Sequence, residues 1–169
     1  DRLLSRGLGD VYKRQDSEYT RSDHLVFGIE YNNTDSSRFS LEAFNKKYYN
    51  YPVSVNDMVS LANKGGDFEV LGNEDVSTSG RGKSYGIEFL YQQKLKNNFY
   101  GILSYTFFYS KFSGFDEVFL PSVWDNRNLI SFTGGYKLKK NWEISSKLRF
   151  TDKTPYAPIN NKLSSQSYP

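Results

Sequence analysis

Apolar and polar residues alternate with a period of two along most of the chain from His24 onward. The clearest stretch is Trp142–Phe150, whose even positions are mostly apolar and whose odd positions carry charged or hydroxyl side chains. Successive side chains of a β-strand point to opposite faces, so this period is typical of strands that have one apolar face. A helix would place the same residues in no consistent stripe. The pattern therefore predicts an all-β fold.

The alternation predicts about six strands, most of them longer than the average of about 5–6 residues. Their expected positions are Leu25–Tyr31, Phe39–Ala43, Tyr85–Tyr91, Phe99–Tyr109, Asn128–Leu138 and Trp142–Phe150. Aromatic residues make up 17% of the chain, while all hydrophobic residues make up 37%. This combination favours alternating strands over helices with a leucine-rich core.

The connections between these strands alternate in length. Asn32–Ser37, Leu95–Asn98 and Lys139–Asn141 are short, whereas Asn50–Gly80 and Ser113–Asn126 are long. Short turns at one end of a sheet and long loops at the other are the layout of an outer-membrane barrel. We therefore expect an all-β, antiparallel, up-and-down transmembrane β-barrel, present as a fragment.

A weak internal repeat supports this expectation. The sequence Lys94–Phe99 (KLKNNF) recurs as Lys137–Trp142 (KLKKNW). In each copy one expected strand ends, a turn of polar residues follows, and the next strand begins at an aromatic residue. The rings of Phe99 and Trp142 would then lie at one membrane edge, as in the aromatic girdles of such barrels. A strand from Trp142 to Phe150, tilted by about 40°, spans roughly 20 Å, close to the apolar band of about 25 Å.

The second face of the expected sheet carries charges of both signs. Glu30, Glu88, Glu143, Lys147 and Arg149 lie on it, among glycine and serine residues. Such a face suits the water-filled or plugged lumen of a barrel. It equally fits the solvent face of a soluble sheet, so alternation alone leaves both open. Strand length, loop asymmetry and the repeated turn favour the barrel.

Composition excludes several classes of function. The chain has no cysteine, which excludes disulfide frameworks, thiolate metal sites and cysteine nucleophiles, and it has one histidine. Its 22 Lys and Arg against 19 Asp and Glu give a net charge of only +3, much of it in residues 1–15. This balance removes the electrostatic argument for nucleic-acid binding. No apolar stretch approaches the length of a membrane-spanning helix.

Three sequence features could suggest a phosphate-binding loop, a catalytic histidine or a calcium site, but each lacks residues that such a site requires. Gly82-Lys83-Ser84 resembles the end of a phosphate-binding loop, but position 77 is serine rather than glycine and a strand follows. His24 starts a strand and has no identifiable Ser or Cys partner. The acidic residues of the first long connection match no calcium-loop spacing; they are Asp57, Asp67, Glu69, Glu74 and Asp75. We therefore expect no catalytic residue, no metal ligand and no cofactor, and hence no enzyme.

Aromatic residues in the long connections are the candidates for ligand contact. Tyrosine and tryptophan rings stack on sugars and other flat ligands, although loop packing uses the same rings. Tyr48 and Tyr49 are also available. The candidates are Tyr51, Phe115, Phe119 and Trp124.

The two ends of the chain differ from the alternating region between them. Residues 1–15 lack both the alternation and the apolar core of a signal peptide, so we expect an artefactual or disordered tail. Residues 16–151 are expected to form the partial barrel. Residues 152–169, rich in Ser, Asn and Pro, are expected to be a truncated loop. Both ends indicate a fragment of a longer protein.

Three segments, taken in order, resemble a known family. Gly80–Glu88 (GRGKSYGIE) runs into an alternating strand, Pro121–Asn128 (PSVWDNRN) precedes another, and Thr154–Pro158 (TPYAP) follows the last. In this order and at hairpin spacing, they resemble the C-terminal half of the barrel of TonB-dependent outer-membrane receptors, particularly those of Bacteroidetes-like bacteria. The resemblance covers roughly residues 20–160.

The resemblance implies a bacterial outer-membrane location and a barrel of about 22 strands closed by an N-terminal plug. Members of the family import siderophores, cobalamin, oligosaccharides or peptides, using the proton-motive force. The implied partners are outer-membrane lipids, the plug and remaining strands of the same protein, the TonB complex and, in some members, a surface lipoprotein. Without a plug, the fragment is not competent to transport alone.

The motifs that carry the resemblance are mainly structural. Asp125 and Arg127 are placed to pair and to order the loop that enters a strand. Gly82 and Gly86 would allow other parts of the wall to approach the backbone closely. No ligand-contact residue is carried over from the family.

Three other classes of protein remain open. A small outer-membrane β-barrel with a structural or adhesion role would need a closing strand near each terminus. A barrel-embedded hydrolase would need Ser or Asp partners near His24. A soluble carbohydrate-binding β-domain would bury its rings between two sheets.

Overall fold

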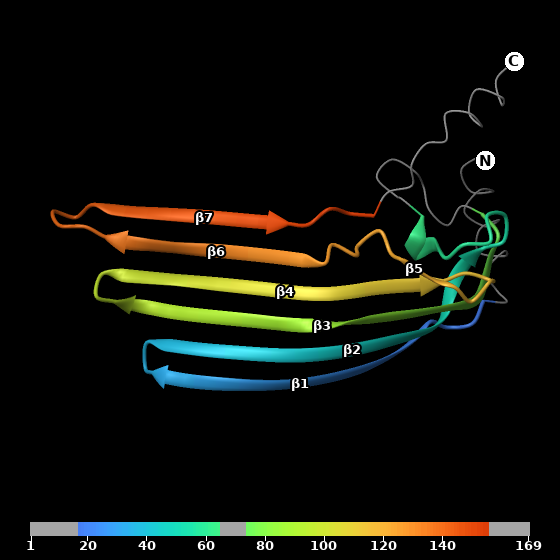
Figure 1. Cartoon of the computed structure of the whole chain (residues 1–169), viewed down its shortest axis with the longest axis horizontal. Coiled ribbons are helices and arrows are strands. Elements are labelled where there is room, and N and C mark those ends of the chain that lie inside the picture. The colour runs from blue at the N-terminus through green and yellow to red at the C-terminus, as the bar shows by residue number, and fades with distance from the viewer. Residues whose placement is uncertain (1–16, 65–73, 156–169) are drawn as a thin grey trace, which may run out of the picture.

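The chain forms one antiparallel sheet, seen in a computed structural model that describes residues 17–64 and 74–155. Its strands follow the spatial order β1-β2-β3-β4-β6-β7, and a short β5 pairs with β4 (Figure 1). The strands are β1 (Arg21–Thr34), β2 (Ser37–Ser54), β3 (Val76–Lys96), β4 (Phe99–Ser113), β5 (Phe119–Pro121), β6 (Asn128–Lys137) and β7 (Glu143–Thr151). One 3₁₀ turn, η1 (Leu61–Asn63), lies between β2 and β3. The predicted all-β antiparallel fold is confirmed.

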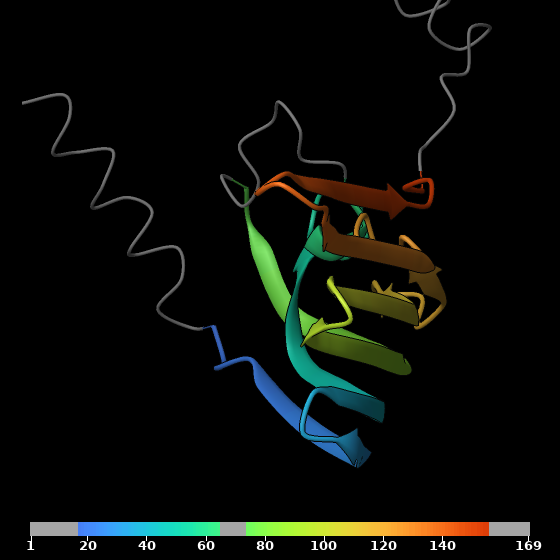
Figure 2. The ribbon, with the colours of Figure 1, turned by 90° about the vertical axis from the view of Figure 1, so that its left-hand side faces the viewer.

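The sheet is curved and open rather than a closed barrel (Figure 2). Within the described ranges, β1 pairs only with β2 and β7 only with β6, so each has a free edge. The same ranges contain no helix that is long and apolar enough to cross a membrane.

The connections alternate in length as the sequence predicts (Figure 1). The β1–β2, β3–β4 and β6–β7 turns lie at one end of the sheet, and the β2–β3 and β4–β6 connections lie at the other. The two copies of the sequence repeat form equivalent turns. Asn97 and Asn98 have φ values of 50° and 67°, and Lys140 and Asn141 have φ values of 61° and 63°. Two consecutive residues with positive φ match the right-handed twist of a hairpin, which explains why the polar pairs recur.

The first long connection is shorter than predicted. Strand β2 continues to Ser54 and β3 begins at Val76, so parts of the expected loop Asn50–Gly80 are paired strand. Alternation does not reveal this pairing because two register shifts interrupt it. The second connection contains the unexpected β5, whose three residues pair with the end of β4.

Strand register places the apolar side chains of all six long strands on one side of the sheet, here called the apolar face. One row across this face consists of Ile29, Leu41, Phe89, Tyr105, Ile130 and Phe150. No second layer covers it among the described residues, and Leu25 and Phe27 are 73% and 71% exposed. The opposite side, here called the polar face, carries the row Glu30, Ser40, Leu90, Ser104, Ser131 and Arg149.

Candidate functional site

The buried hydrophobic side chains of the described chain gather where the long connections meet the sheet. Val53, Ala62 and Phe112 are buried there, with Phe112 only 5% exposed. The ring centroid of Phe112 lies 4.5 Å from that of Tyr51 and 5.4 Å from that of Tyr48. We call these five residues the loop-end core. The fold thus packs its long connections against the sheet, and not a second sheet against the first.

A β-bulge in β2 builds this core. Tyr48 pairs with Gly82 and Tyr51 pairs with Gly80, so β2 holds one extra residue between them, and Asn50 there has a φ of 54°. The extra residue turns Tyr51 to the face that already carries Tyr48. Gly82 leaves room for the neighbouring ring, because a Cβ at this position would lie 2.3 Å from Cε1 of Phe112.

A buried hydrogen-bond network anchors the second long connection. The Asp125 side chain, 1% exposed, accepts a hydrogen bond from the backbone N–H of Ser110 at 3.0 Å. The hydroxyl of Ser122 donates to that of Ser110 at 2.8 Å. Nε of Arg127 lies 3.3 Å from Oδ2 of Asp125, which confirms the predicted pair. The Arg127 guanidinium also lies 4.2 Å from the ring centroid of Tyr109.

An ion-pair clamp fixes the first long connection. Nζ of Lys64 lies 2.5 Å from a carboxylate oxygen of both Asp57 and Glu74, and the hydroxyl of Ser54 donates to Glu74. The Lys64 ammonium and the Ser54 hydroxyl hold the pKa of Glu74 below its ordinary value. The two carboxylates raise the pKa of Lys64. The clamp therefore joins the end of η1 to the segment that immediately precedes β3.

Acidification is expected to open the clamp. Because the pKa of Glu74 is lowered in the fold, its stabilising effect is present above the ordinary pKa of 4.5 and is lost as pH falls through the lowered value. The reporter is hydrogen exchange at the amide of Val55, which donates to the carbonyl of Asp75 at 3.0 Å. A Glu74→Gln variant is expected to lack the acid transition. The same transition in both proteins would contradict this assignment.

The polar face carries two shallow hollows that share Ser104 and Thr106. One, of about 200 Å³, is also lined by the carboxylates of Glu42 and Glu88, which lie directly opposite each other on β2 and β3. The other, of about 330 Å³, is also lined by Arg149. A strip of hydroxyl groups between carboxylates and a guanidinium both donates and accepts hydrogen bonds. Such a strip suits contact with a polar, hydroxyl-rich ligand or protein segment.

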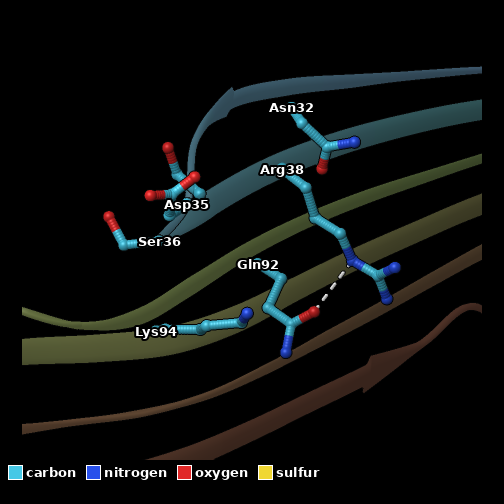
Figure 3. Close-up of a pocket in the computed structure, with 7 residues that line it drawn as sticks. Asn32, Asp35, Ser36, Arg38, Gln92 and Lys94 are labelled. Carbon is cyan, nitrogen blue, oxygen red and sulfur yellow. Dashed lines mark hydrogen bonds between the residues drawn. The ribbon is translucent and has the colours of Figure 1, made fainter.

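A third hollow, of about 40 Å³, lies at the short turns (Figure 3). Nε of Arg38 donates to Oε1 of Gln92 at 2.8 Å, and the Arg38 guanidinium lies 3.6 Å from the Glu30 carboxylate. The carbonyl of Ser36 accepts from the backbone N–H of Lys94 at 2.7 Å. These contacts join the β1–β2 turn to β3, and the hollow is too small for an organic ligand.

The four predicted ligand-contact residues all lie at the long-connection end, but the structure does not gather them into one site. Tyr51 belongs to the loop-end core. The Phe119 ring lies 4.3 Å from Nζ of Lys83. Phe115 and Trp124 are 38% and 55% exposed. Among the described residues, no ring contact joins any two of the four.

The other motifs from the sequence also have places in the structure. Gly82-Lys83-Ser84 lies inside β3, so it forms no phosphate-binding loop. His24 is in β1, with the ring of Tyr48 at 6.2 Å. Of the acidic residues, Asp57 and Glu74 bind Lys64, whereas Asp67 and Glu69 lie outside the described residues. In the part of the chain that the structure describes, no three His, Asp or Glu side chains form a metal-binding group.

Sequence reasoning missed the loop-end core, the clamp and the hydroxyl strip. Each depends on residues from different strands or connections, and alternation within one strand carries no signal for such contacts. The one local signal is the run Lys47–Tyr51 (KYYNY), where an asparagine interrupts the alternation at the bulge. In comparisons with protein-family models, with curated proteins and with solved structures, the chain has no significant match.

Proposed function

We propose that the chain is part of the wall of a bacterial outer-membrane β-barrel, and specifically of a TonB-dependent receptor that imports a nutrient. The observation that carries this proposal is the continuous apolar face, which crosses all six long strands and is uncovered among the described residues. Exposed apolar patches of this extent mark contact with a membrane or another protein.

The height of the apolar face supports contact with a bilayer. On β4 this face runs from Phe99 to Tyr109, about 33 Å along the strand, and a tilt of about 40° reduces the span to about 25 Å. Aromatic residues border it at the short-turn end, where Phe99 pairs with Tyr136 and Trp142 is 71% exposed. Rings at the border of an apolar band are typical of the membrane interface.

The polar face and the long connections support an import pathway in particular. The hydroxyl strip would line the lumen, and the long connections would meet the ligand outside the cell. The family assignment itself rests on the three ordered segments GRGKSYGIE, PSVWDNRN and TPYAP. The substrate class would be a siderophore, cobalamin, an oligosaccharide or a peptide. Transport would also need a plug and the TonB complex.

The principal alternative, a soluble carbohydrate-binding β-domain, fits the exposed rings less well. It requires a second layer over the apolar face, and none lies among the described residues. A small barrel with a structural or adhesion role would have the same wall. The DNA sequence on both sides of this segment distinguishes it from the receptor. A continuous upstream reading frame that encodes a signal peptide and a plug supports the receptor, whereas stop codons close to both ends contradict it.

The membrane location has a direct test on the full chain. In water we expect aggregation and no cooperative thermal unfolding, because the strand edges and the apolar face are uncovered. In phosphatidylcholine vesicles the free edges must also be paired, so we expect copies of the chain to associate edge to edge, with the far-UV circular dichroism of a β-sheet and protection of the strands from protease. A sharp cooperative melt of soluble monomer in the absence of lipid would overturn the proposal.

A further inference from the structure

Three lysines lie side by side on the apolar side of the sheet, at its long-connection end. Lys47 of β2 pairs with Lys83 of β3, and Lys83 pairs with Lys111 of β4. We call them the lysine row. The next row toward the short turns contains Tyr85 and Tyr109, whose ring centroids lie 5.3 Å apart. The lysine row therefore borders the apolar face directly.

No ion pair among the described residues neutralises the positive charges of this row. Within residues 17–64 and 74–155, the ion pairs involve Arg21, Arg38, Lys64 and Arg127, and none of the three lysines. Asp23 pairs in register with Lys47, but its carboxylate lies 3.0 Å from the Arg21 guanidinium.

Such a row is unfavourable without an anion. Side chains directly opposite on neighbouring strands have Cβ atoms about 5 Å apart, and like charges at this spacing destabilise a sheet. The rings that contact Lys83 and Lys111 do not remove this repulsion, since they carry no net charge; they belong to Phe119 and Tyr109. A bound anion would turn the repulsion into attraction.

The opposite border of the same face differs. There the last paired row consists of Lys96, Phe99, Tyr136 and Ile144, so it holds three apolar or aromatic residues and a single lysine. Three lysines on adjacent strands thus occur at one end of the face, whereas the other end holds one. This asymmetry would give the two leaflets of a bilayer different contacts.

We propose that the lysine row binds the phosphate headgroup of an anionic lipid whose acyl chains lie on the apolar face beside it. A lipid satisfies both features at once, because its charge meets the cations and its chains cover the adjoining apolar rows. A free phosphate or a nucleic acid would meet the lysines alone. The inference rests on the proposed membrane location and adds a lipid-binding site to it.

The test compares vesicles of phosphatidylcholine alone with vesicles doped with phosphatidic acid. The full chain is diluted from urea into each, and partitioning is followed by tryptophan fluorescence. A lysine beside an anionic membrane surface strengthens binding by about fivefold, so the row is expected to give up to about a hundredfold. The gain should shrink as salt is raised. A variant carrying Lys47→Gln, Lys83→Gln and Lys111→Gln is expected to lose most of the gain, and the corresponding arginine variant to keep it.

The control variant removes the same charge from the polar face, by Lys46→Gln, Lys137→Gln and Lys147→Gln, and is expected to keep the gain. Binding to neutral vesicles with no gain from phosphatidic acid, or an equal loss in both variants, would overturn the lipid site and leave the membrane location standing. No binding to neutral vesicles would overturn the membrane location itself. Loss of the gain with inorganic phosphate, but not with chloride of equal ionic strength, would reassign the row to free phosphate.

Discussion

Leu41→Arg is expected to destabilise the membrane-embedded chain by about 2–4 kcal/mol, the cost of a cation at the lipid-facing midplane of a barrel wall. Leu41 lies in a central row of the apolar face, opposite Ile29 and Phe89, and is 44% exposed. In water alone this exposure would make the substitution nearly neutral. A large effect is expected only if lipid covers the face. The measurement is urea unfolding in phosphatidylcholine vesicles, followed by circular dichroism.

The neighbouring residue provides the matched control. Ser40 lies on the polar face, opposite Glu30, so Ser40→Arg adds the same charge on the other side of the same strand. We expect it to change stability by less than about 0.5 kcal/mol, as a surface substitution does. Equal effects of the two substitutions would show that the faces do not have different surroundings, which contradicts the barrel wall.

Phe112→Ala is expected to be the most damaging substitution at the long-connection end, with a loss of about 3–5 kcal/mol. Its ring is almost fully buried against Tyr48 and Tyr51, and its Cε1 would lie 2.3 Å from a Cβ at Gly82. The reporter is hydrogen exchange at the amide of Val123, which donates to the carbonyl of Ala62 at 3.0 Å. The exchange protection of the Val123 amide should fall by the factor that corresponds to this loss of free energy. The amides of the long strands should stay protected.

Phe115→Ala is the control, because it removes the same side chain from a position that is 38% exposed. It is expected to change protection of Val123 only slightly. Gly82→Ala alters the same core from the neighbouring strand β3. It should also reduce protection of the Val123 amide, because the added methyl group would overlap the Phe112 ring. If Phe112→Ala and Phe115→Ala behave alike, the long connections are not held by the loop-end core.

The alternation of residues was enough to predict six antiparallel strands, their two faces and the unequal connections. These features follow from backbone geometry within one strand, where side chains alternate every residue, and from turns that need positive φ. The paired turns at Asn97-Asn98 and Lys140-Asn141 are local in the same sense, which is why the repeat identified both of them.

The contacts that build the candidate sites were decided only by the tertiary structure. Lys47, Lys83 and Lys111 are far apart in the chain and come together through the register of three strands. The bulge at Asn50 changes which face Tyr51 occupies, so a count of alternate residues places it wrongly. Register depends on turn geometry, bulges and side-chain packing between strands. The period of the sequence therefore determined which residues share a face within each strand, and only the pairing of strands determined which of them meet.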